Sequence, residues 1–334
     1  MLNNYIISLQ YYCTMKTTVE VFVYSIKIRG EKKNHNFSVG EDLFVKIKKE
    51  FINYIHNSQT GDKPDLQRTV RIPSMNPDGT VYHGINEEMR AIYGIIESGL
   101  YGRHLQIVNK DNPEEILKQF DKNSAVIKPF FFMLNVPKCG DCGYFILQRT
   151  DNEGISPLFI SILSAFFKQV FGEQNGFMIE KRGYISKPLV RSIKDGKVKS
   201  LTVCLKKIPK DLADRYMMSH LDEDTSLSIT LNFKGGLGKN HKLRKSIIDD
   251  KTIFTAGTEL SELADNGDIK IVTSSDQNGI NRDRTIYLDD SNNSNVRPYY
   301  IWDVVESSNG YPTLESLYKS AIQFVKENKD LNNI

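Results

Sequence analysis

Short apolar runs of β type dominate this sequence, and only a few segments have helical spacing. Residues 18–28 show the clearest strand pattern, with Val19, Val21 and Val23 alternating with other residues. The runs at 129–136 and 143–148 flank a short polar segment and predict a β-hairpin. Strands and helices do not alternate in the regular order of a doubly wound sheet. The sequence therefore predicts an α+β fold with largely antiparallel sheets.

Other segments complete this prediction. Apolar residues at helical spacing, or an N-cap followed by proline, indicate five helices. These are expected at 42–56, 113–120, 158–171, 210–221 and 313–328. Further strands are expected at 68–72, 92–97, 104–108, 177–179, 198–205, 226–233, 269–273 and 285–288.

The length of 334 residues predicts two domains. We expect a break near residues 150–155, where a hairpin ends and a proline-initiated helix begins. The predicted parts are an N-terminal extension at 1–14, a mixed α/β domain at 15–150 and a basic mixed α/β domain at 155–334. Because the 158–171 helix is apolar on all sides, we expect it to be the buried centre of the second domain.

Composition predicts a cytoplasmic protein. The first residues lack the basic segment and the cleavage site of a secretory signal. No apolar run reaches the roughly 18 residues of a membrane-spanning helix, so we expect no membrane insertion. Four cysteines in 334 residues argue against a secreted disulfide scaffold.

Positive charge is concentrated in one part of the chain. Residues 181–245 contain 16 Lys and Arg against 6 Asp and Glu, whereas the rest contains 28 against 35. Such a concentration is what binding to a phosphate backbone requires. A solvated basic face, or one that pairs with an acidic protein surface, would give the same linear pattern. The candidate nucleic-acid-binding residues are Lys181, Arg182, Lys187, Arg191, Lys194, Lys197, Lys199, Lys206, Lys207, Lys234, Lys239, Lys242, Arg244 and Lys245.

Within this stretch, residues 234–239 read Lys-Gly-Gly-Leu-Gly-Lys. Backbone amides of a glycine-rich turn before a helix can bind an anion. The segment is not a nucleotide-hydrolysing loop, because Phe233 and Asn240 occupy the positions where that motif needs Gly and Ser or Thr. A phosphate contact and a plain glycine loop are both consistent with it.

Cys139 and Cys142 have the spacing of a metal-binding turn at the tip of the predicted hairpin. A structural zinc needs four ligands, and the sequence has no second pair with this spacing. Two reduced cysteines in a tight turn are the alternative, and we expect no cofactor.

A metal-dependent nuclease would need an acidic residue upstream of a (Asp/Glu)-x-Lys motif. That spacing occurs four times, so it is unspecific. The best-placed set is Asp249 and Asp250 upstream of Asp268 and Lys270, where Asp268 is also a typical turn residue at the start of a strand.

These observations favour a non-enzymatic protein that binds nucleic acid, DNA rather than RNA, without sequence preference. It could belong to a larger microbial assembly such as a phage-defence system. A metal-dependent nuclease is one alternative, and a protein-interaction subunit or homo-oligomer is another.

Overall fold

The computed structural model describes most of the chain. The described residues are 14–28, 33–57, 62–63, 67–73, 82–150, 153–171, 177–205, 227–248, 268–277, 280–287, 299–328 and 331. They divide into two compact units, one of residues 1–182 with 299–334 and one of residues 183–298. In both, helices accompany largely antiparallel sheets, so the predicted mixed α+β class is confirmed at this level.

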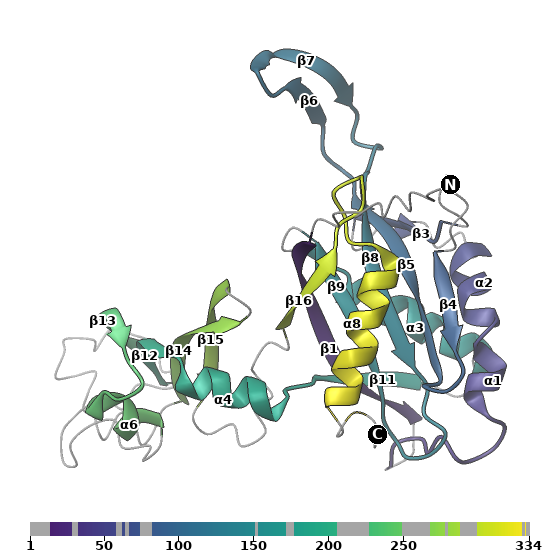
Figure 1. The fold of residues 1–334 in the computed structure, drawn as a ribbon. Coiled ribbons are helices and arrows are strands. Elements are labelled where there is room, and N and C mark those ends of the chain that lie inside the picture. Colours follow the sequence, from purple (N-terminus) through teal and green to yellow (C-terminus); the bar gives the residue numbers. More distant parts are fainter. Residues whose placement is uncertain are drawn as a thin grey trace, which may run out of the picture. The chain divides into compact units, whose positions relative to one another are not determined.

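The first unit contains a ten-stranded sheet with the order β11-β1-β9-β8-β5-β3-β2, to which β10, β16 and β4 add at β9, β1 and β5 (Figure 1). Its strands are β1 (Thr14–Ile28), β2 (Asp62–Lys63), β3 (Arg68–Arg71), β4 (His83–Asn86), β5 (Ala91–Leu100), β8 (Val126–Asn135), β9 (Gly143–Thr150), β10 (Glu153–Gly154), β11 (Phe177–Gly183) and β16 (Tyr299–Val305). Its helices are α1 (Leu43–Ile47), α2 (Glu50–Asn57), α3 (Ser156–Phe171) and α8 (Leu314–Glu327). The separate ribbon of β6 (Leu105–Asn109) and β7 (Asn112–Phe120) also belongs to this unit.

Alternation along β1 sets the two faces of the large sheet. Phe22, Tyr24 and Ile26 join an aromatic core with α1, α2 and α3. Phe51 of α2 and Phe159 of α3 lie in the same cluster, with ring centroids 6.3 Å apart. The opposite face is covered by α8 (Figure 1).

The contacts of α8 explain why the chain returns to the first unit after residue 298. Phe324 of α8 packs against Tyr300 and Trp302 of β16, which are 5% and 7% exposed. β16 in turn pairs with the first half of β1. These aromatic side chains therefore cover a core.

The second unit contains a four-stranded sheet with the order β13-β12-β14-β15. Its elements are α4 (Lys187–Asp195), β12 (Lys197–Leu205), β13 (Leu227–Leu237), α6 (Lys242–Ile248), β14 (Asp268–Gln277) and β15 (Ile280–Tyr287). Helix α4 lies against β14, and its Leu189 is buried together with Leu201 and Ile271 of the sheet.

Three expectations differ from this structure. The expected domain break near 150–155 falls inside the first unit, and α3, expected at the centre of the second domain, packs on the large sheet. The helix expected at 113–120 is wrong, because this segment forms strand β7 and pairs with β6. The helix expected at 210–221 lies outside the described residues. Among the described residues, no helix has the length and apolar character needed to cross a membrane.

Candidate functional site

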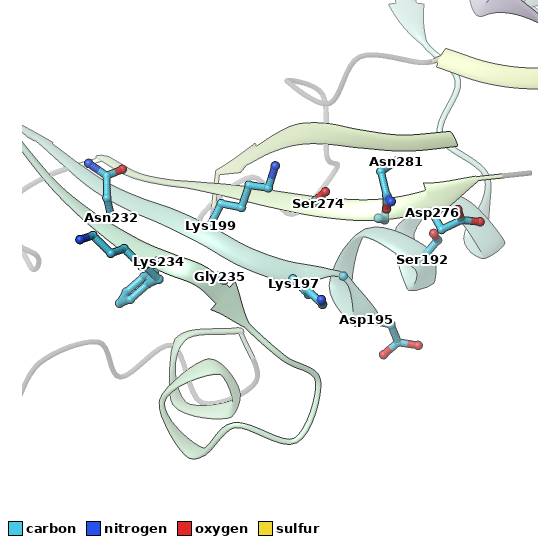
Figure 2. Close-up of a pocket in the computed structure, with 14 residues that line it drawn as sticks. Ser192, Asp195, Lys197, Lys199, Asn232, Lys234, Gly235, Ser274, Asp276 and Asn281 are labelled. Atoms are coloured by element: carbon cyan, nitrogen blue, oxygen red, sulfur yellow. The ribbon is translucent and has the colours of Figure 1, made fainter. Parts of the chain in front are cut away.

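A wide pocket of about 830 Å³ lies in the second unit, where α4 ends and β12 begins (Figure 2). Its cations are Lys197 and Lys199 of β12 and Lys234 of β13. The other lining residues are neutral or acidic. They are Ser192, Asp195, Gly196, Asn232, Phe233, Gly235, Gly236, Ser274, Ser275, Asp276 and Asn281.

Strand alternation and a bulge set the faces of β12. Val198 pairs with Thr273 and is fully buried, but the next paired residue is Ser200, opposite Val272. Lys199 is therefore the extra residue of a bulge. Alternation places Lys197 and Lys199 on the face opposite Val198, and both line the pocket. The extra residue lets the buried side chains of Leu201 and Val203 share the face of Val198.

Two glycines bring the end of β13 against β12. Gly235 and Gly236 have φ of +75° and +71°, a backbone conformation that favours glycine. A Cβ at Gly236 would lie 3.2 Å from the Cβ of Lys197. The glycine segment is thus the end of a strand, and it places Lys234 at the same pocket as Lys197. It does not form the predicted turn before a helix, because α6 begins at Lys242.

Two lysines at or near the pocket form ion pairs. Lys199 lies 2.8 Å from Asp283 of β15, and Lys239 lies 3.2 Å from Asp195 at the end of α4. All four side chains are between 42% and 63% exposed, so these pairs contribute little stability and leave the lysines available to another anion.

The predicted basic residues of α4 share one face. Lys187, Arg191 and Lys194 are all exposed, and their spacing of four and three residues places them in a row along the helix. Ser192 and Asp195, each one residue further along, line the pocket. The cationic row therefore borders the pocket.

Charge in this unit is uneven. Its described residues carry 13 Lys and Arg against 4 Asp and Glu, whereas the whole of 183–298 carries 19 against 16. The positive excess therefore lies in the described sheet and helices.

Arg244 does not belong to this surface. It is only 4% exposed, and its guanidinium donates to the carbonyl oxygens of Gly196 at 3.3 Å and Lys239 at 3.1 Å. Arg244 therefore holds α6 against the corner between α4 and β12. Its neighbours Lys242 and Lys245 are exposed.

Lys181 and Arg182 belong to the first unit, and Lys206 and Lys207 lie outside the described residues. The Lys181 amine donates to Ser156 Oγ and lies 4.6 Å from the centre of the Phe22 ring. Burial lowers the pKa of Lys181, and the charge of Glu20 partly opposes that shift.

Of the candidate nuclease residues, Asp268 and Lys270 lie in the part of the chain that the structure describes. Asp249 and Asp250 lie outside the described residues. Asp268 begins β14 opposite Cys204, and Lys270 pairs with Thr202 and Tyr287. The described residues contain no cluster of three metal-ligating side chains.

Cys139 and Cys142 lie between β8 and β9, as predicted for the hairpin. Cys139 is exposed, and neither cysteine forms a disulfide. The pKa of Cys142 is raised to about 11, chiefly by burial and also by Asp141, which accepts its hydrogen bond and repels the thiolate. No third ligand accompanies them in the part of the chain that the structure describes.

Sequence reasoning did not find the neutral part of the site. Asn232, Ser274 and Asn281 come from three different strands. They are ordinary polar residues within strands, and only the strand register brings them together. No protein-family model, no curated protein and no solved structure matches this chain.

Proposed function

We propose that the 183–298 unit binds nucleic acid through the phosphate backbone, without sequence preference. The observation that carries this proposal is the convergence of Lys197, Lys199 and Lys234 on one pocket that the cationic row of α4 borders. Cations from separate elements on a continuous surface can contact successive phosphates, and each contact releases condensed counterions.

The types of residue support binding without sequence preference. The cations that line the pocket are lysines, which act as point charges on a flexible stem. The described pocket lining contains no arginine, whose planar guanidinium presents the paired donors of bidentate recognition. Contacts to phosphate fix the position of a protein on nucleic acid and carry no sequence information.

The test compares two variants that lose equal charge. A triple variant with Lys197→Gln, Lys199→Gln and Lys234→Gln removes the pocket cations. A control with Lys122→Gln, Lys319→Gln and Lys326→Gln removes three exposed cations from the first unit. Binding of labelled duplex DNA, single-stranded DNA and RNA of one sequence is measured by fluorescence anisotropy at about 100 mM salt.

We expect the pocket variant to bind at least tenfold more weakly than the wild type and the control to bind within about twofold of it. DNA is the first ligand to test. Equal losses in both variants would show that binding reflects net charge alone. Absence of binding by the wild type at low salt would refute the proposal and leave an acidic protein partner as the occupant of this surface.

A further inference from the structure

The ribbon of β6 and β7 stands apart from the large sheet of the first unit (Figure 1). The two strands pair with each other and with no other described strand. All nine residues of β7 except Phe120 are exposed. A lone two-stranded hairpin is marginally stable in water, so a second surface is expected to cover it.

The ribbon exposes large apolar side chains. Ile107, Val108, Ile116 and Leu117 are 49%, 38%, 51% and 57% exposed. Ile107 lies on one face of the ribbon, and Val108 and Ile116 lie on the other. Apolar side chains exposed on an element that is separate from the core mark sites of protein association.

The pairing register assigns side chains to the two faces of the ribbon. Leu105 pairs with Phe120 and Ile107 pairs with Lys118, so these four share a face. Val108 and Ile116 form the opposite pair. We call the first set, with Asn109 and Glu115, the Ile107 face.

Contacts across this face agree with the assignment. Lys118 Nζ lies 5.0 Å from the centre of the Phe120 ring, and Asn109 Nδ2 donates to Glu115 Oε2 at 2.8 Å. A cation and an anion therefore lie at different positions along β7 on one apolar face. Such a pattern is self-complementary. A two-fold axis between the two positions places Lys118 of each copy opposite Glu115 of the other copy.

We propose that the Ile107 face of the ribbon packs against the same face of a second copy of this chain. Ile107 lies at the centre of that interface, and Lys118 meets Glu115 of the second copy on each side of the two-fold axis. The register shifts between Ile107 and Val108 and between Val108 and Asn109 interrupt the strand ladder. Such irregular edges resist strand addition, which favours packing of faces over pairing of edges.

Sedimentation velocity of the full chain tests this, at about 1 to 200 µM, the range suited to an interface of small area. We expect the wild type to dimerise with rising concentration. Ile107→Lys should weaken the dimer at least tenfold. Ile116→Lys, the matched change on the opposite face, should leave the dimer within about twofold, and circular dichroism should show both variants folded.

A charge exchange tests the pairing itself. Lys118→Glu alone and Glu115→Lys alone should each weaken the dimer, and the double variant should restore it, because each copy then carries both exchanged charges. A wild type that stays monomeric at about 200 µM would overturn the proposal. Equal effects of the Ile107 and Ile116 variants, or a double variant no better than the single ones, would also overturn it.

Discussion

Arg244 shows that a positive charge in a basic segment can have a purely structural role. Its linear surroundings are those of a phosphate-binding residue, but its guanidinium is buried and donates to two backbone carbonyl groups. A buried carbonyl that loses its donor costs about 1–3 kcal/mol.

Arg244→Met should therefore lower the free energy of unfolding of the second unit by about 1–3 kcal/mol. Lys245→Met removes the same charge from an exposed neighbour and should leave stability within about 0.5 kcal/mol. Urea denaturation followed by circular dichroism measures both. Two variants of equal stability would contradict the structural role of Arg244.

Asp42 has two roles at the start of α1. Its carboxylate accepts from the Phe44 amide at 3.0 Å and forms two hydrogen bonds with the guanidinium of Arg90, at 2.5 and 2.9 Å. These interactions, led by the hydrogen bond to Arg90, lower the pKa of Asp42 from 3.8 to about 2. A lowered pKa in the folded state contributes stability above the unfolded pKa, and that contribution is lost as pH falls from about 4 to about 2.

Asp42→Asn keeps a side chain that can cap the helix but removes the charge. We expect the variant to be less stable than the wild type at pH 6, and the difference to shrink as pH falls toward 2. Asp42→Ala should lose about 1 kcal/mol more, because it also removes the cap. Unfolding free energies at pH 2.5, 4 and 6 check this. A stability difference between the wild type and Asp42→Asn that does not change with pH would refute the charge interaction of Asp42 with Arg90.

At the scale of elements, close backbone approach fixes the pairing of β5 and β8. A Cβ at Gly99 would lie 2.5 Å from the carbonyl oxygen of Val126. Gly99→Ala should therefore displace one strand and destabilise the first unit by about 1–3 kcal/mol. Gly238→Ala meets nothing within 4 Å and serves as the control. Thermal unfolding measures both, and equal melting temperatures would contradict the close approach at Gly99.

The elements that the sequence predicted well carry one-sided or buried apolar patterns. The runs at 129–136 and 143–148 form β8 and β9, which pair as a hairpin. The prediction failed at 113–120, where Asn112 and Pro113 resemble the start of a helix. That segment is exposed along almost its whole length, so no buried face shaped its pattern, and pairing with β6 decided its structure.

Part of the candidate site could be predicted from the local concentration of charge. Lysines 197, 199 and 234 stood out through local charge, and the structure brings them to one pocket. Local sequence could not show that Arg244 reaches Gly196, 48 residues away, or that β12 has a bulge at Lys199. Contacts of this kind depend on long-range packing and register.

At the scale of the whole molecule, the division of the chain follows pairing between distant segments. The apolar pattern of α3 predicted burial but could not show which sheet covers it. β16 pairs with β1 although 285 residues separate Trp302 from its partner Thr17, so residues 299–334 complete the first unit. The 183–298 unit is thus inserted between two parts of the first.

The proposed function requires that the lysines of the pocket contact phosphates. The most direct measurement is the salt dependence of duplex DNA binding, between about 50 and 200 mM, for the wild type and the Lys197, Lys199 and Lys234 variant. Each phosphate contact contributes about 0.9 to the slope of log K against log salt. We predict that the variant's slope is smaller in magnitude by about 2 to 3. An unchanged slope in the variant would show that these lysines do not contact phosphates.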